Sequence, residues 1–254
     1  MIRAEHLTKR FGALSAVTDL NLEIAQGEFF AFLGPNAAGK TTTIKLLTGL
    51  LKPTSGRALV CGHDIQQEPV VARKLMSYVP DLPFLYDKLQ PMEFMLFVGQ
   101  LYGMARTDVV CAADELFDMF GLNEARGQLI ENLSHGTRQR VVIASALLHD
   151  PKVIIIDEPM VGLDPRSARV VKDVLKARSR AGTTVFLSTH TLQIAEELAD
   201  RIGILNRGRL IAVGTMDELH AASGEGGPLE DTFLTLTREE QQEQAKGVTT
   251  TALR

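Results

Sequence analysis

A short run of residues near the N-terminus has the types and spacing of a phosphate-binding loop. Glycine and lysine stand at fixed positions in Gly34-Pro35-Asn36-Ala37-Ala38-Gly39-Lys40-Thr41-Thr42, which satisfies the pattern G-x-x-x-x-G-K-S/T. Backbone N–H groups in such a turn point at phosphate oxygens, and the N-terminus of the next helix adds a favourable dipole. Lys40 supplies a positive charge to the same oxygens, and the Thr41 hydroxyl is placed to bind Mg²⁺. The run predicts a nucleotide phosphate site, with a chance match in an ordinary turn as the alternative.

Two neighbouring carboxylates follow an apolar segment further along the chain. Residues 153–156 are typical of a buried strand, and Asp157 and Glu158 come directly after them. Open α/β sheets bind ligands at the carboxyl ends of their strands. Asp157 would hold Mg²⁺ through water, and Glu158 would orient or deprotonate the attacking water. Alone, the pair is equally typical of a solvated loop, but with the phosphate loop it predicts nucleotide hydrolysis.

Strands and helices alternate around these two motifs. Strands are expected at 17–24, 29–33, 153–156, 185–187, 202–205 and 210–213, from alternating or continuous apolar patterns. Helices are expected at 44–51, from 91, at 109–120, from 135 to about 148, at 165–181 and at 192–198. Pro91, Ser134 and Asp164-Pro165 mark starts, and Gly121 and Gly182 mark ends. This order predicts an α/β fold with a mainly parallel sheet and a helical insertion at about 82–150.

Composition narrows the class of protein. The 254 residues are 45% hydrophobic and 23% charged, which excludes a wholly disordered or collagen-like chain. The longest apolar stretches, such as 141–148, are too short for a membrane span, and the first ten residues lack the apolar core of a signal peptide. Cys61 and Cys111 have no metal-site spacing and fit a reducing cytoplasm. The net charge of −4 argues mildly against non-specific nucleic-acid binding.

A third motif, Leu133-Ser134-His135-Gly136-Thr137, precedes a helix shortly before Asp157. With the two motifs above, in this order, the chain resembles the ATP-binding subunit of an ABC transporter over about residues 1–219. The family's signature usually reads L-S-G-G-Q, so Ser134 and Gly136 match while His135 and Thr137 depart. The resemblance implies that this serine and glycine bind the γ-phosphate of ATP held by the opposite subunit, in a head-to-tail homodimer or heterodimer. His135 either adds a donor there or points outward.

Further positions follow the family's order. Phe11 stands where the family has an aromatic that stacks on adenine, although a core phenylalanine is the alternative. The segment 161–164 resembles the loop that crosses the dimer, with Val161 and Gly162 in place of the common Ser-Ala. Asp164 would be both a helix cap and a dimer contact. His190 resembles the switch histidine that contacts the γ-phosphate, although a lone histidine is usually structural.

Two further residues near the expected site differ from those usual in the family. Ala37 stands where the family usually has glycine, and a positive φ there would cost roughly 1 kcal/mol. Asp81, after Tyr78-Val79-Pro80, stands where glutamine is usual. It can still offer oxygen to Mg²⁺ or accept a hydrogen bond from water. By resemblance it would couple the Mg²⁺ site to the helical insertion and the permease, with an ordinary loop aspartate as the alternative.

The resemblance implies a P-loop NTPase core with a mainly parallel sheet, an N-terminal antiparallel β subdomain and an inserted α-helical subdomain. The ATP-binding domain would cover 1–219, and 220–254 would be a linker, at 223–228, and a tail. ATP and Mg²⁺ would be the cofactors, and a multi-span permease on a separate chain would be the partner, with no nucleic acid. The subunit would lie at the cytoplasmic face of the cell membrane, peripheral through the permease. Residues 229–237 resemble the ending of ATP subunits of ABC-2-type exporters, or form a helix that closes off the domain.

Two other classes of function compete. A soluble ABC ATPase acting on nucleic acid or ribosomes would have long heptad arms or two ATP domains, whereas Lys40 and Ser134 are 94 residues apart with no sustained heptads between them. A module that binds ATP without hydrolysing it is disfavoured by Glu158 and His190. An ATPase that drives a permease is the leading hypothesis.

Overall fold

A six-stranded sheet forms the centre of the fold. The computed structural model describes residues 1–82, 84–223, 230–231 and 233–235. The order of strands in this sheet is β10-β9-β3-β8-β7-β6, and every neighbouring pair is parallel except β9 and β10. The strands are β3 (Phe29–Leu33), β6 (Met76–Val79), β7 (Val153–Asp157), β8 (Thr184–Thr189), β9 (Arg201–Asn206) and β10 (Arg209–Gly214). Every residue of β3 and β7 is buried, as the continuous apolar runs predict.

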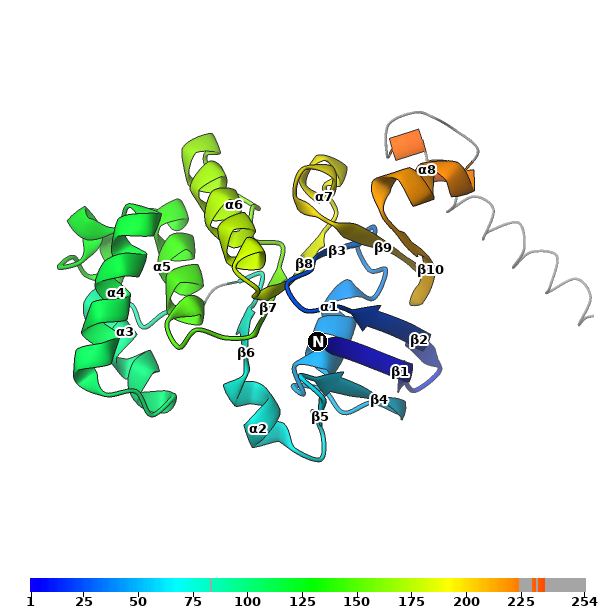
Figure 1. The fold of residues 1–254 in the computed structure, drawn as a ribbon, viewed down its shortest axis with the longest axis horizontal. Helices are drawn as coiled ribbons and strands as arrows, with labels where there is room; N and C mark the ends of the chain where they lie inside the picture. Colours follow the sequence, from blue (N-terminus) through cyan, green and yellow to red (C-terminus); the bar gives the residue numbers. More distant parts are fainter. Residues whose placement is uncertain (83, 224–229, 232, 236–254) are drawn as a thin grey trace, which may run out of the picture.

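A second sheet of four antiparallel strands lies beside the first (Figure 1). Its order is β2-β1-β4-β5, with β1 (Ile2–Phe11), β2 (Leu14–Ile24), β4 (Ser55–Val60) and β5 (His63–Asp64). Helix α1 (Lys40–Leu47) packs between the two sheets, where Ile44, Leu46 and Leu47 are fully buried with Phe30 and Phe32 of β3. The α/β class, the mainly parallel sheet and the antiparallel β subdomain are therefore confirmed.

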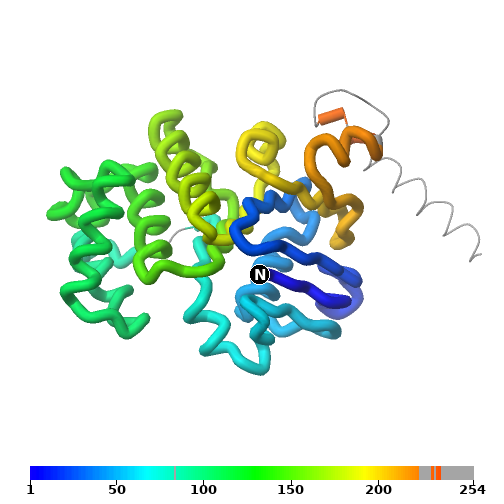
Figure 2. The backbone as a smooth tube through the Cα atoms, viewed as in Figure 1, coloured from blue at the N-terminus to red at the C-terminus, as the bar shows by residue number. Residues whose placement is uncertain are grey.

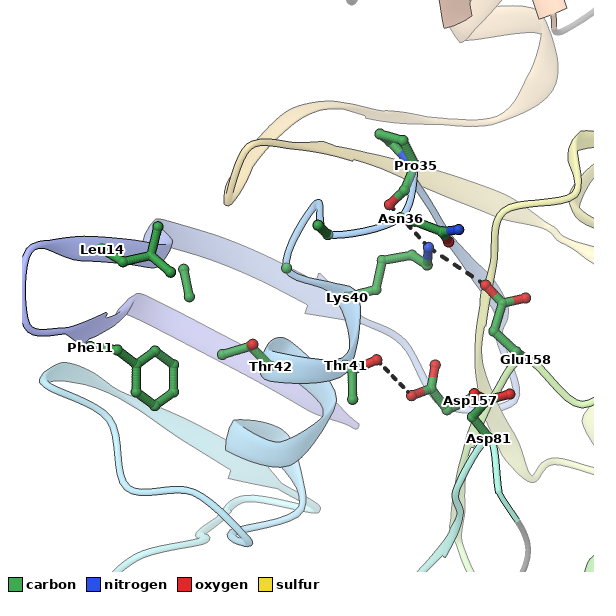
Figure 3. Close-up of a pocket in the computed structure, with 13 residues that line it drawn as sticks. Phe11, Leu14, Pro35, Asn36, Lys40, Thr41, Thr42, Asp81, Asp157 and Glu158 are labelled. Atoms are coloured by element: carbon green, nitrogen blue, oxygen red, sulfur yellow. Dashed lines mark hydrogen bonds and ion pairs between the residues drawn. The ribbon is translucent and has the colours of Figure 1, made fainter.

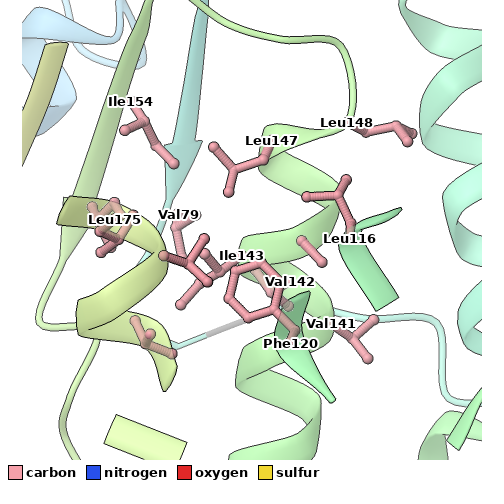
Figure 4. Close-up of a cluster of buried hydrophobic side chains, with 14 of the residues drawn as sticks. Val79, Leu116, Phe120, Val141, Val142, Ile143, Leu147, Leu148, Ile154 and Leu175 are labelled. Atoms are coloured by element: carbon pink, nitrogen blue, oxygen red, sulfur yellow. The ribbon is translucent and has the colours of Figure 1, made fainter. Parts of the chain in front are cut away.

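Helices cover the other side of the parallel sheet. Helices α3 (Pro91–Leu101), α4 (Arg106–Phe120) and α5 (His135–Leu147) gather at one end, beyond α6 (Pro165–Arg180), as the tube in Figure 2 shows. Side chains of α4, α5, α6 and the sheet share one buried cluster, which includes Phe120, Ile143, Ile154 and Leu175 (Figure 4). Two 3₁₀ turns, Asn123–Ala125 and Ile130–Asn132, connect α4 to α5. The remaining helices are α2 (Pro69–Lys74), α7 (Leu192–Leu198) and α8 (Met216–Ser223).

Most of the helix ends follow the local signals in the sequence. Pro91 is the first residue of α3, and Gly121 ends α4 in the left-handed conformation. Ser134 caps α5 by accepting a hydrogen bond from the backbone of Thr137, and the Asp164 carboxylate caps α6. These caps satisfy backbone donors that have no partner within the helix.

The helix after the phosphate loop is shorter than its apolar spacing predicts. It ends at Leu47 rather than near residue 51, because Gly49 adopts a left-handed φ of 69°. Leu50 is 60% exposed as a result. A side chain at residue 49 would also collide with Ile65, whose Cγ1 lies 2.7 Å from the position of a Cβ there.

A histidine and a tyrosine stack where two of the helices end. The rings of His149, after α5, and Tyr102, after α3, lie 3.6 Å apart and nearly parallel. Burial lowers the pKa of His149 to about 4, although the Met76 backbone and the charge of Asp150 oppose the shift. The neutral imidazole is therefore the form that this packing favours.

The predicted linker lies outside the described residues except for Ser223, which ends α8, and so does most of the predicted tail. Among the described residues, no helix combines the length and the hydropathy of a transmembrane span.

Candidate active site

A pocket of about 350 Å³ opens between the phosphate loop, the turn that joins β1 to β2, and the carboxyl ends of β6 and β7 (Figure 3). Two of the three sequence motifs contribute to it, the phosphate loop and the Asp157-Glu158 pair, and the signature segment does not. Its lining consists of Phe11, Leu14, Ala16, Pro35, Asn36, Ala37, Gly39, Lys40, Thr41, Thr42, Asp81, Asp157 and Glu158.

The backbone of the phosphate loop lies very close to neighbouring segments, and Ala37 and Gly39 in it have a positive φ. A Cβ at Gly34 would lie 2.4 Å from the carbonyl oxygen of Leu205, and one at Gly39 would lie 2.5 Å from that of Ala16. Gly39 has a φ of 107° and precedes the first residue of α1. Ala37 has a φ of 63°, so the strain of about 1 kcal/mol for an alanine in this region applies here.

Lys40 is nearly buried and lies across the loop. Its Nζ donates hydrogen bonds to the carbonyl oxygens of Gly34, at 2.7 Å, and Pro35, at 3.3 Å. The same atom lies 3.5 Å from Oε1 of Glu158. The loop therefore holds the ammonium group of Lys40 in the pocket, where it faces the carboxylate of Glu158.

Thr41 and Asp157, both expected near Mg²⁺, contact each other directly. The Thr41 hydroxyl donates to Oδ2 of Asp157 at 3.0 Å, and the Ser188 hydroxyl donates to Oδ1. Asp157 is 1% exposed. Ser188 was not among the predicted site residues; it pairs with Asp157 in the register of β7 and β8, which only the order of strands in the sheet can reveal.

The oxygen donors suit a magnesium ion. Mg²⁺ prefers oxygen ligands and is usually held by one or two carboxylates together with substrate phosphates and water. The pocket offers the Thr41 hydroxyl and the carboxylates of Asp157 and Asp81. Within the described ranges, no group of three or more His, Cys, Asp or Glu side chains could hold a metal alone.

Glu158 directly follows β7 and contacts His190, which directly follows the neighbouring strand β8. Nδ1 of His190 lies 2.9 Å from Oε1 of Glu158, and the Glu158 N–H donates to the carbonyl oxygen of Ser188 at 3.1 Å. Glu158 itself has a left-handed φ of 47°. Strained residues of this kind persist where the surrounding structure fixes them, and they cluster at functional sites.

Negative charge accumulates near Asp81. Burial raises the pKa of the Asp81 carboxyl, the charges of Asp157 and Glu158 raise it further, and His190 opposes them. Burial, again with help from Asp157 and Asp81, raises the pKa of Tyr78 to about 12. A cation in this part of the pocket would relieve the repulsion between the carboxylates.

Phe11 lies at the opposite end of the pocket (Figure 3). Its side chain is 48% exposed, so it is not a core residue. It pairs with Leu14 across β1 and β2, and Nζ of Lys9 lies 5.1 Å from its ring centroid. An exposed aromatic face in this place is available to stack on a flat ring such as a nucleobase.

The signature residues do not line this pocket. Ser134 and Thr137 bond to each other through their hydroxyls at 2.9 Å, at the start of α5. Gly136 packs against the start of α6, where the Asp164 carboxylate accepts the N–H groups of Arg166 and Ser167, each at 3.0 Å. His135 turns towards the loop of residues 159–163, with Nε2 at 3.4 Å from the carbonyl oxygen of Val161.

A hairpin that the sequence analysis did not connect to the site supports the phosphate loop from behind. The Gly208 N–H, in the turn between β9 and β10, donates to the carbonyl oxygen of Ala38 at 2.7 Å. The Gly208 carbonyl accepts from Thr18 of β2 at 2.8 Å. A Cβ at residue 208 would lie 2.7 Å from the carbonyl oxygen of Ala16, so glycine is required there.

Known proteins resemble the chain in sequence and in structure. A family model described as ABC transporter matches residues 17–161. The daunorubicin/doxorubicin resistance ATP-binding protein DrrA of Streptomyces peucetius is 40% identical over 88% of this chain and 68% of its own length. The linearmycin resistance ATP-binding protein LnrL of Bacillus subtilis is 37% identical over 93% of this chain and 75% of its own length.

Solved structures agree with these relatives. An ATP-binding subunit of an ABC transporter superposes with a TM-score of 0.88 at 31% identity, over 93% of this chain and 99% of that one. A dimeric ATP-binding cassette in a post-hydrolysis state, bound to ADP and Pi, gives a TM-score of 0.77 at 26% identity, over 85% of this chain and 99% of that one. The chain therefore belongs to the ABC transporter family, of which it is an ATP-binding and ATP-hydrolysing subunit.

Proposed function

We propose that this subunit drives export through a separate multi-span permease, and that Glu158 is the base of its ATPase reaction. The observation that carries the assignment of the site is the meeting of Lys40, Glu158 and the Thr41–Asp157 pair in one pocket. Export is supported by the relatives, whose names include drug resistance ATP-binding proteins and a Nod factor export ATP-binding protein.

The reaction follows from the residues of the pocket. The loop amides and Lys40 bind the phosphates, and Phe11 stacks on the adenine. Glu158 accepts a proton from the water that attacks the γ-phosphate. His190, 2.9 Å from Glu158, orients that carboxylate and contacts the γ-phosphate. Thr41, Asp157 and Asp81 would hold Mg²⁺, which when bound offsets the negative charge of the phosphates.

A second subunit completes each site. Ser134 and Gly136 stand at the start of a 13-residue helix but do not line the pocket of their own subunit. The N-terminus of such a helix favours an anion. A head-to-tail dimer brings this helix start to the γ-phosphate held by the partner, with Asp164 in the contact between the two subunits.

We assign the permease contact to an exposed apolar surface beside Asp81. It consists of Leu82, Phe84, Tyr86, Phe97 and Leu101, all exposed. Tyr86 joins the group, because its ring lies 5.5 Å from Phe84 and 5.3 Å from Phe97. Exposed aromatic clusters of this kind are typical of interaction sites. An apolar cytoplasmic segment of the permease would occupy the surface and place the subunit at the cytoplasmic face of the membrane.

Co-purification tests this function. We expect the tagged chain, expressed in its native cells, to retain a multi-span membrane protein in mild detergent, and the complex to release phosphate from ATP. Phe84→Ser and Leu101→Ser should reduce retention, while Val70→Ser, an equally exposed position on α2, should not. Retention of ribosomes or nucleic acid in place of a membrane protein would contradict the proposal.

A further inference from the structure

The imidazole of His135 packs against the loop that follows Glu158 in the same subunit. Its Nε2 lies 3.4 Å from the carbonyl oxygen of Val161. A Cβ added to Gly162 would lie 3.2 Å from Nε2 and 3.3 Å from Cδ2 of the ring. A side chain at residue 162 would therefore push the ring away by a few tenths of an ångström.

The loop itself has few strong internal restraints. Within residues 158–164, the Val161 N–H donates to the Glu158 carbonyl and the Leu163 N–H donates to the Met160 carbonyl, both at a long 3.3 Å. Met160 and Leu163 are partly buried against the core. His135, the first residue of α5, adds a contact to this loop at Val161.

A second contact joins the first turn of α5 to the end of the same loop. A Cβ at Gly136 would lie 3.0 Å from Oγ of Ser167 and 3.2 Å from Oδ2 of Asp164. The α5 start therefore touches the loop in its middle through His135 and at its far end through Gly136. Glu158, at the near end, contacts Lys40 and His190 in the pocket.

We propose that His135 is a positioning residue for ATP hydrolysis, which ties the loop after Glu158 to the signature turn. The proposal rests on the roles proposed above for Glu158 and Ser134. When the partner's nucleotide engages Ser134, the His135 contact with Val161 and Gly162 fixes the loop and, through it, Glu158. His135 and Gly162 lie against each other, with a spacing that a Cβ at residue 162 would tighten.

Four variants of the full chain test the contact: His135→Gly, His135→Gln, Gly162→Ala and the double variant His135→Gly with Gly162→Ala. Hydrogen exchange of the Val161 and Leu163 amides and steady-state ATPase kinetics are measured for each. We expect His135→Gly to speed exchange and lower kcat by about threefold to tenfold, with KM for ATP changed less than about twofold. His135→Gln should restore both, because its amide nitrogen reaches about as far as Nε2.

The double variant separates packing from backbone strain. Gly162 has a φ of 72°, so an alanine there is strained in any background. Gly162→Ala should therefore cost activity in both backgrounds, but several-fold more where His135 is present. Equal effects in both backgrounds, or unchanged exchange in His135→Gly, would overturn the proposal. Normal hydrolysis by Glu158→Gln would instead contradict the role proposed for Glu158. The hydrogen-exchange rates would still test the His135 contact, because they do not depend on hydrolysis.

Discussion

The ammonium group of Lys40 lies 3.5 Å from the carboxylate of Glu158, and both side chains are largely shielded from solvent. Opposite charges attract strongly where water is excluded. The γ-phosphate of ATP is a competing anion for Lys40, so its binding would release Glu158 from this contact. The carboxylate would then be free to accept a proton from water.

Glu158→Gln should therefore separate binding from hydrolysis. The amide keeps the size of the side chain but does not accept the proton, so we expect ATP affinity to remain and turnover to fall by about 100-fold or more. ATP-bound dimers should accumulate, which size-exclusion chromatography with light scattering measures. Lys40→Ala is the contrasting variant, because it should weaken ATP binding itself; retained affinity there would contradict the assignment of the phosphate loop.

Complementation between two inactive subunits tests the composite site. A Ser134→Ala subunit and a Lys40→Ala subunit should each be nearly inactive alone. In a mixture, each heterodimer has one intact site, built from Lys40 of one chain and Ser134 of the other. With random pairing and independent sites, about a quarter of the parent ATPase rate should return. A mixture no more active than its components would show that the two residues act within one polypeptide.

Asp81 should matter for coupling more than for ATP binding. Asp81→Ala removes both charge and oxygen, so transport-linked ATPase activity should fall, while Lys40 and the loop amides keep ATP affinity nearly normal. Asp81→Asn keeps one oxygen and should lie between the alanine variant and the parent. Affinity, ATPase rate and transport are measured together in reconstituted membranes, with Asp173→Ala on the exposed face of α6 as a control. If Asp81→Ala transports like the parent, Asp81 is only a solvated loop residue and has no role in coupling.

His149 should make stability depend on pH. Its folded pKa of about 4 lies below the ordinary 6.5, so the unfolded state binds the proton more tightly. Its contribution to stability is present above pH 6.5 and is lost as the pH falls towards 4. Because His149 as a whole is only partly buried, we expect a loss of about 1 kcal/mol in the free energy of unfolding between pH 7 and pH 5. Urea unfolding at both pH values measures it.

His149→Phe is the matched variant for that measurement, since it keeps an aromatic ring to stack on Tyr102. It should lack the contribution of the histidine. The difference in free energy of unfolding between parent and variant should therefore change by about 1 kcal/mol over this pH range. An identical pH dependence in the two proteins would mean that the imidazole is not protected from protonation by its packing.

Signals confined to a few neighbouring residues predicted much of the fold. Pro91, Gly121, Ser134 and Asp164 mark helix ends that the structure confirms, because capping depends on local backbone groups. The strand β1 was not singled out, since irregularities in its pairing with β2, between Ala4 and Arg10, break the alternation of buried and exposed residues. The strand β5 has only two residues, too few for a pattern.

Contacts across the sheet could not be predicted in the same way. The motifs placed Lys40, Thr41, Asp157 and Glu158 in one pocket because each follows a strand. The Ser188 bond to Asp157 and the Gly208 bond to Ala38 depend on which strands are neighbours. The sequence also left the direction of His135 open, and its packing on Gly162 arises from how α5 meets the loop before α6.

The hydrogen bond from the Gly208 N–H to the Ala38 carbonyl affects when the phosphate loop can form during synthesis of the chain. Synthesis reaches the phosphate loop early, but β3, which leads into it, has β8 and β9 as neighbours, and the hairpin behind the loop ends at residue 214. A chain emerging from the ribosome cannot form this loop in its final shape until those strands follow. Pairing between such distant segments is slow. The growing chain therefore gains its nucleotide site only when the sheet is complete, and ATP in the cell can stabilise only chains that have reached this stage.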